Sequence, residues 1–96
     1  MLNKQVILEN LRNHREDISQ LGVGRIGLFG SFARGDESAQ SDLDFLVEFK
    51  DKSFDNYMNL REFLENLFHR RVDLVIKESL KPRLRQKIFS ELIDAA

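Results

Sequence analysis

Apolar residues recur along this chain with two different periods, and the change of period separates helices from strands. In residues 3–20 they recur at steps of three and four, which predicts a helix with one apolar face. That face carries Ile7, Leu11, His14, Ile18 and Leu21. Gly22 then marks the end of the helix. In residues 42–49 alternate positions are apolar instead, which predicts a strand with Leu43, Phe45, Val47 and Phe49 on its buried face.

The other segments complete an α-β-β-α-β-α order. Two further strands are predicted over 25–30 and 71–77, the second with Val72, Leu74 and Ile76 inward. Residues 31–41 are polar and form a turn with room for one helical turn. A helix over 54–68 is capped near Ser53, and Ser79 and Pro82 mark the start of a last helix. The apolar face of that last helix carries Leu84, Ile88, Phe89 and Leu92.

This order predicts an α+β (mixed α/β) fold, in which helices pack on a small mixed sheet of three to four strands. Ninety-six residues without a linker or an internal repeat are expected to form a single domain, residues 1–96. A chain this short holds one small core and has no room for a second lobe around a large substrate.

Composition narrows the class of protein. The chain is 42% hydrophobic and has eight Phe, which argues against intrinsic disorder. No apolar run has the roughly 18 residues of a membrane span, and the charged N-terminus lacks a signal-peptide core. The chain has no cysteine, which excludes disulfides and thiolate metal sites. These features together predict a cytoplasmic protein with no membrane partner.

Charge is unevenly placed although the net charge is only −1. Residues 36–55 hold seven acidic residues against two lysines, and residues 69–87 hold seven basic residues against two acidic ones. A near-neutral total argues against a dedicated nucleic-acid-binding protein. Separate acidic and basic patches suit a site where cations and phosphates meet, although two solvated faces would give the same pattern.

Gly22, Gly24 and Gly27 spell a G-x-G-x-x-G pattern that does not indicate a dinucleotide site. Such a fingerprint follows a strand and begins a helix, whereas these glycines follow a helix and run into a strand. A helix end with close backbone packing explains them better.

Three aspartates carry the chemistry that the pattern predicts. Asp42 and Asp44 lie two apart on one strand, so both carboxylates project from the same face. Charges that close repel each other, and a divalent cation bound by hard oxygen ligands, Mg²⁺ or Mn²⁺, would resolve the repulsion. Asp73 lies in the middle of an apolar strand, and it reaches the other two if the two strands pair. Three carboxylates on neighbouring strands would hold two metal ions for an in-line phosphoryl displacement.

Gly30 and Ser31 supply the other half of that chemistry. A glycine after a strand lets the backbone approach a phosphate, and the N–H groups of a following helical turn and the Ser31 hydroxyl are donors for it. Arg34 faces the same phosphates in this interpretation.

The Gly30-Ser31 pair, ten residues, then Asp42-Leu43-Asp44, with Asp73 on a later strand, resembles the polymerase-beta-type nucleotidyltransferase superfamily. The fuller string GSFARGDESAQSDLDFLV is similar to its small bacterial and archaeal members, the minimal nucleotidyltransferases. The resemblance covers residues 23–77 and implies the polymerase-beta palm fold. It implies metal binding by Asp42 and Asp44, completion of the metal site by Asp73, and a triphosphate held by Gly30 and Ser31.

The resemblance also implies a partner. Minimal nucleotidyltransferases are commonly encoded beside a HEPN-domain toxin, and they act as its antitoxin by moving AMP from ATP to a tyrosine of the toxin. Transfer of AMP from Mg·ATP to a protein hydroxyl is therefore the expected activity. Two alternatives stay open: an antitoxin that neutralises a toxin by contact alone, and transfer to a small molecule such as an aminoglycoside. A site this open is expected to be completed by a partner protein or by a second copy in a homodimer.

Each site residue also has a plainer interpretation. Asp42 and Asp44 would otherwise line a solvated strand edge, and Asp73 would be a surface or salt-bridged acid. Ser31 would be a helix cap and Arg34 a surface charge.

Overall fold

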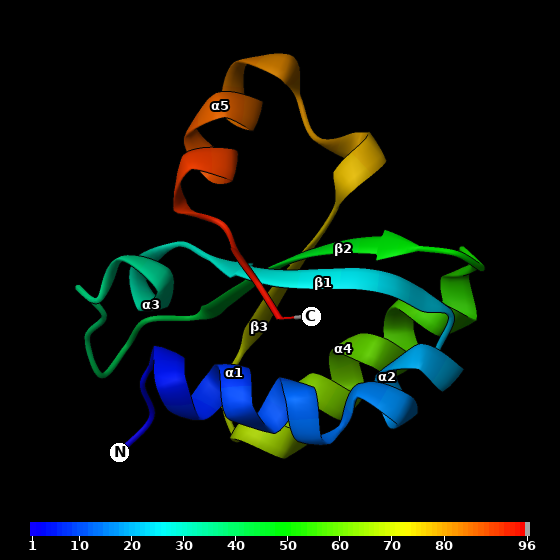
Figure 1. The fold of residues 1–96 in the computed structure, drawn as a ribbon, viewed down its shortest axis with the longest axis horizontal. Helices are drawn as coiled ribbons and strands as arrows, with labels where there is room; N and C mark the ends of the chain where they lie inside the picture. The colour runs from blue at the N-terminus through cyan, green and yellow to red at the C-terminus, as the bar shows by residue number, and fades with distance from the viewer. Residues whose placement is uncertain (96) are drawn as a thin grey trace.

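A four-stranded mixed sheet forms the centre of the fold (Figure 1). It is seen in a computed structural model that describes residues 1–95, so that Ala96, the last residue of the predicted domain, lies outside the described residues. The strand order is β3-β2-β1-β4. The strands are β1 (Val23–Phe29), β2 (Leu43–Phe49), β3 (Val72–Ile76) and β4 (Ile93–Asp94). β1 runs antiparallel to β2 and β4, whereas β2 and β3 are parallel, which confirms the predicted mixed sheet.

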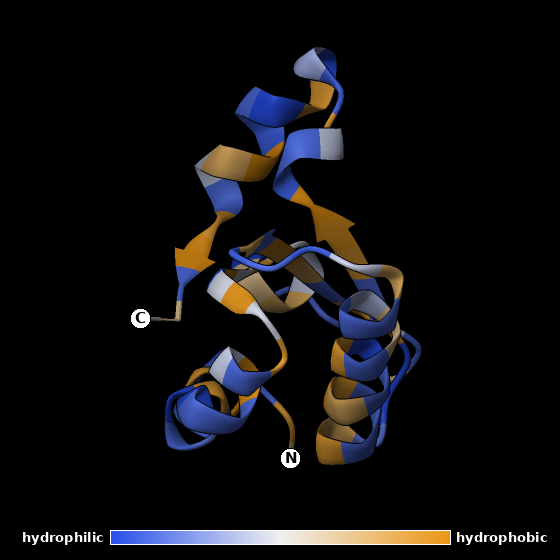
Figure 2. Ribbon diagram, turned by 90° about the vertical axis from the view of Figure 1, so that its right-hand side faces the viewer, coloured by the Kyte–Doolittle hydropathy of each residue, from blue (hydrophilic) through white to orange (hydrophobic). Residues whose placement is uncertain are grey.

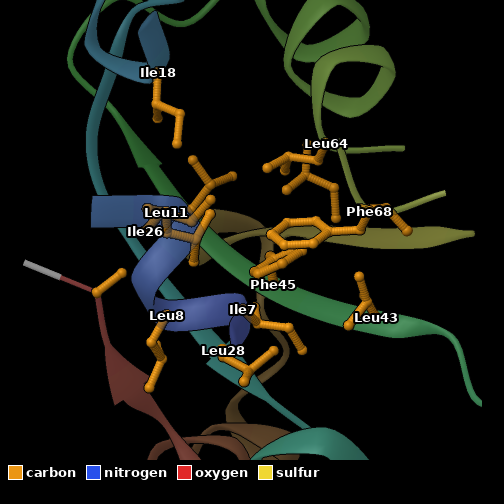
Figure 3. Close-up of a cluster of buried hydrophobic side chains, with 14 of the residues drawn as sticks. Ile7, Leu8, Leu11, Ile18, Ile26, Leu28, Leu43, Phe45, Leu64 and Phe68 are labelled. Atoms are coloured by element: carbon orange, nitrogen blue, oxygen red, sulfur yellow. The ribbon is translucent and has the colours of Figure 1, made fainter. Parts of the chain in front are cut away.

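Helices cover the two faces of the sheet unequally (Figures 1 and 2). α1 (Lys4–Asn13), α2 (Arg15–Gln20) and α4 (Phe54–Phe68) pack on one face and bury the main core, whose side chains are drawn in Figure 3. Within residues 1–95, α5 (Pro82–Glu91) and the short 3-10 helix η1 (Lys77–Ser79) lie on the side of the other face. Among residues 1–95, no helix is long and apolar enough to cross a membrane.

The alternation predicted for residues 42–49 decides which face of β2 enters the main core. Leu43, Phe45 and Val47 have no exposed surface, and Phe45 stacks on Phe68 of α4 with ring centroids 6.1 Å apart. Phe49, at the end of the strand, is only partly buried. The even-numbered residues of β2 therefore face α5 instead, and among them is Asp44.

The helix predicted over 3–20 is two helices that meet at His14. The backbone of His14 is not helical (φ −108°, ψ 18°). Its ring donates from Nδ1 to the Asn10 carbonyl at 2.8 Å and packs edge-on against Phe63, with centroids 5.8 Å apart. The break lies at this residue because its polar ring bonds its own helix and also contacts α4. The period of the apolar residues does not reveal such contacts.

Gly22 ends α2 as predicted, with a left-handed backbone (φ 82°). A Cβ at this position would lie 2.6 Å from the Asp51 carbonyl oxygen, and the Gly22 carbonyl accepts hydrogen bonds from the Lys50 and Asp51 N–H groups. The glycine thus joins the end of α2 to the end of β2, and the helix-stop interpretation of the G-x-G-x-x-G pattern is confirmed.

The last helix is the main correction to the predicted packing. α5 begins at Pro82 as predicted, but none of its residues is buried. Leu84 and Phe89, predicted on its apolar face, are 42% and 37% exposed. Ile88 and Leu92 are partly buried against a small second cluster formed by Phe29, Leu46 and Leu80. A single helix on a sheet face with one small cluster has too few apolar partners to bury a full stripe.

This difference in packing gives a measurable contrast between two phenylalanines. Phe45→Ala removes a fully buried ring and is expected to cost about 3–5 kcal/mol of unfolding free energy. Phe89→Ala removes a partly exposed ring of α5 and is expected to cost less than about 1 kcal/mol. Urea unfolding followed by circular dichroism measures both, and a cost for Phe89→Ala close to that of Phe45→Ala would place α5 in the main core after all.

Candidate active site

The parallel pairing of β2 and β3 brings two of the predicted carboxylates together. Asp44 lies opposite Asp73 in the register of the two strands. Their strand neighbours Leu43, Phe45, Val72 and Leu74 are buried on the core face, so both aspartates project from the face that α5 covers. Asp42 directly precedes β2, and the Leu43 N–H donates to the Arg71 carbonyl at 2.9 Å, which fixes this entry to β2 beside the start of β3.

Gly30 is packed against one of these carboxylates. It follows β1, whose last residue Phe29 pairs with Asp44. The backbone of Gly30 has φ 81°, and a Cβ there would overlap the Asp44 carboxylate. Any side chain at this position would therefore push Asp44 away, so the space and the backbone conformation both require glycine.

The predicted helical turn inside residues 31–41 is confirmed as α3 (Ser31–Arg34). Gly30, rather than Ser31, occupies the position before the turn, and no side chain caps it. The cap interpretation of Ser31 is therefore wrong. The turn places Ser31 directly after Gly30, beside the strand end that carries Asp44.

The surroundings of Asp44 favour the protonated form of its carboxyl group. Burial of the side chain is the largest cause that raises the pKa of Asp44, and the charges of Asp73, Asp42 and Glu91 add to it while Arg34 opposes them, which together bring the pKa from 3.8 to about 6. Asp44 is half-buried, whereas Asp42 and Asp73 are exposed. The site thus concentrates negative charge around one partly desolvated carboxylate, with one arginine nearby to offset it.

Arg34 is held by two carboxylates rather than standing free at the surface. Its Nε donates to Asp36 at 3.1 Å and its Nη1 donates to Glu91 at 2.9 Å. The other oxygen of Glu91 accepts the Gly30 N–H at 3.2 Å. Glu91 is the last residue of α5 and was not among the residues predicted for the site. Nothing in its local sequence distinguishes it from a solvated helix end, because its contacts are with residues about sixty positions earlier.

Arg70 is a second residue that the sequence does not reveal. It follows α4 and donates from Nη1 to the carbonyls of Ser41 at 2.9 Å and Ala39 at 3.2 Å. Its guanidinium also lies 5.2 Å from the centre of the Phe32 ring in α3. Arg70 thereby ties the loop before Asp42 to the turn after Gly30, the two segments on either side of the carboxylates.

The donor set fits a divalent cation in its chemistry. Asp42, Asp44 and Asp73 offer only hard, anionic oxygens, and burial together with the neighbouring carboxylates Asp73 and Asp42 raises the pKa of Asp44. Within residues 1–95, no three histidine or carboxylate side chains already form a closed group around a metal position. Asp44 and Asp73 share a sheet face and Asp42 directly precedes β2, but the three side chains are not gathered into a preformed cage.

The sequence of this chain is similar to those of known proteins. The family model of the nucleotidyltransferase domain matches residues 11–95. The chain is 38% identical to a protein adenylyltransferase, MntA, of Thermococcus cleftensis, over 97% of this chain and 96% of that protein.

Two solved structures have a similar fold. One, described as a candidate minimal nucleotidyltransferase, is 40% identical with a TM-score of 0.73 and covers 90% of this chain and 93% of its own. The other comes from a variant of the toxin–antitoxin pair MntA–HpeT and is 26% identical with a TM-score of 0.66. It covers 98% of this chain and 72% of its own. The predicted nucleotidyltransferase fold is confirmed by these similarities.

Substitution of Gly30 tests the packing of its turn against Asp44. Gly30→Ala and Gly35→Ala both place a side chain at φ near +80°, but only the first meets a neighbour, since nothing lies within 4 Å of a Cβ at Gly35. Gly35→Ala is expected to cost about 1 kcal/mol of unfolding free energy from backbone strain alone, and Gly30→Ala clearly more. Chemical unfolding of both variants measures the difference, and equal costs would contradict the close approach of Gly30 to Asp44.

The raised pKa of Asp44 predicts how stability depends on pH in the metal-free protein. The folded chain binds the proton of the Asp44 carboxyl group more tightly than the unfolded chain does. Asp44 therefore does not lower the free energy of unfolding below pH 3.8, and it lowers that free energy increasingly as the pH rises to about 6. The cost above pH 6 is about 1–2 kcal/mol once the half-exposed position is discounted for solvent screening.

Asp44→Asn removes this cost, so in EDTA it is expected to raise the melting temperature at pH 7.5 and to give no gain at pH 3.5. Thermal melts across this range measure the effect. Glu48→Gln is the control on the same strand, because it breaks an ion pair with Lys77 (3.4 Å) and should give no gain. A gain from Asp44→Asn that is equal at both pH values would contradict the assignment.

Proposed function

Because this chain belongs to the nucleotidyltransferase domain family and is an enzyme of that kind, we propose that it transfers AMP from ATP to a hydroxyl of a partner protein. The observation that carries the proposal is the register of Asp44 opposite Asp73, with the Gly30 turn packed against Asp44. The predicted phosphate-binding turn and the predicted carboxylates are thereby neighbours. We also propose that residues 1–96 act as one minimal domain in the cytoplasm.

In this proposal Asp42, Asp44 and Asp73 hold Mg²⁺, with two ions expected and Mn²⁺ as a substitute. The cations would supply charge neutralisation at the phosphates when bound. The Gly30 N–H, the Ser31 hydroxyl and Arg34 bind the triphosphate and orient it. These groups lie on a turn held between β1 and β2, so most of the rate acceleration comes from positioning and electrostatics.

The chemical step is an in-line displacement at the α-phosphate. The acceptor oxygen forms a bond to that phosphorus as the bond to the bridging oxygen of the β-phosphate breaks, and pyrophosphate leaves. The acceptor loses its proton, and Asp73, exposed at the edge of the site, is the base that takes it. The exposed position suits a base that must meet a hydroxyl carried by another protein.

The proposed acceptor is a HEPN-domain toxin, for which this chain serves as the antitoxin. Support comes from the similarity to the MntA adenylyltransferase and to a chain of the MntA–HpeT toxin–antitoxin pair. An open site on a sheet face also fits an acceptor that arrives on a folded partner rather than a small molecule enclosed by a second lobe. Either the toxin or a second copy of this chain completes the site.

The proposal is tested with α-labelled ATP, Mg²⁺ and the protein encoded by the neighbouring gene, as the proposed acceptor. Wild-type enzyme is expected to label that protein, and Asp42→Asn or Asp44→Asn to lower the rate by at least about a hundredfold while circular dichroism stays unchanged. Glu48→Gln, on the same strand and sheet face, is the matched control and should keep the wild-type rate.

Wild-type transfer by either aspartate variant would contradict the mechanism. Neutralisation of the toxin by Asp42→Asn, measured as growth of cells that express both proteins, separates catalysis from contact. Retained neutralisation without labelling would favour the binding-module alternative.

A further inference from the structure

A carboxylate of this chain already occupies the donors that the proposed function assigns to the nucleotide. Glu91 accepts the Gly30 N–H with one oxygen, at 3.2 Å, and an Arg34 N–H with the other, at 2.9 Å. The Glu91 side chain is only 13% exposed, whereas that of Asp36, the other partner of Arg34, is 60% exposed. Glu91 is therefore the inner of the two carboxylates on Arg34 and the one that also reaches the backbone of the turn.

A carboxylate and a phosphate compete for such donors because both are anions that accept charge-assisted hydrogen bonds. The Gly30 peptide has a single N–H, which makes one strong hydrogen bond at a time. A triphosphate that binds Gly30 and Arg34 must therefore take the place of Glu91. The negative charge of Glu91, which lies near Asp44, also repels an incoming polyanion.

The helix that carries Glu91 is the least firmly packed of the longer helices. No residue of α5 is buried, and its inner side rests on one small cluster through Ile88 and the adjoining Leu92. The segments before and after it are extended at Lys81 and Leu92. Although β4 anchors the chain just after Glu91, movement of the Glu91 side chain alone exposes little apolar surface and leaves the main core intact.

We propose that Glu91 is a built-in competitor of the triphosphate. Glu91 occupies the hydrogen-bond donors of Gly30 and Arg34 until the nucleotide displaces it. The proposal rests on the proposed function only in taking a triphosphate as the ligand of this turn. It assigns to α5 a regulatory contact that sets the apparent affinity for nucleotide. The apparent affinity for nucleotide equals the intrinsic affinity multiplied by the fraction of molecules in which the donors are free of Glu91.

The test uses inorganic tripolyphosphate with a fixed excess of Mg²⁺ and isothermal titration calorimetry on the full chain. Glu91→Gln is expected to bind the probe on the order of tenfold more tightly than wild type. Glu48→Gln removes the same charge from the same sheet face without touching the turn, and is expected to bind as wild type does. Glu91→Asp keeps the charge but is one methylene shorter, so it loses its reach to both donors and should also bind more tightly.

Hydrogen exchange gives a readout that needs no ligand. The Gly30 amide is expected to exchange faster in Glu91→Asp and Glu91→Gln than in wild type, with unchanged rates at core amides such as that of Phe45. Those core rates also report that the variants are folded.

Several results would overturn the proposal. They are equal or weaker tripolyphosphate binding by both Glu91 variants, an equal gain in Glu48→Gln, or no binding by any of the proteins. Weaker binding in particular would make Glu91 a residue that positions the turn. The probe has no nucleoside and undergoes no transfer, so this experiment can fail while AMP transfer succeeds, and the reverse.

Discussion

The parallel register of β2 and β3 is the constraint on which the rest of the site depends. Two like charges opposite each other on neighbouring strands are unfavourable, and Asp44 against Asp73 is such a pair. The arrangement persists because a shift of one residue would turn Leu43, Phe45 and Val47 out of the core. Burial on one face of the strand thus imposes the repulsion on the other, and this repulsion adds to desolvation in raising the pKa of Asp44.

Much of the fold follows from residue patterns that local physics can interpret. Alternation over residues 42–49 identified the buried face of β2, and Ser53 and Pro82 marked where α4 and α5 begin. The spacing of Gly30, Ser31, Asp42 and Asp44 was enough to predict the turn and the strand that the structure brings together at the candidate site. These signals succeed because each depends on neighbours within a few residues.

Features that depend on distant partners were missed. The break at His14 involves a ring on α4, and the two-residue strand β4 exists only through its pairing with Gly27 and Leu28. Glu91 and Arg70 act on the site through contacts with residues far away in the sequence. The predicted packing of α5 was wrong for a related reason. An apolar stripe identifies the face of a helix that can be buried, but it does not show how much apolar surface of the sheet is present to cover that face.

The pairing of β4 with β1 joins the two segments of the sheet that are most distant in sequence. Closing the loop between them costs more chain entropy than closing the β1–β2 hairpin or the β2–β3 crossover. Glu91 lies just before β4, at the far end of the same loop. The contact of Glu91 with the Gly30 turn therefore depends on the longest-range pairing in the described sheet, and weakening that pairing would also weaken this contact.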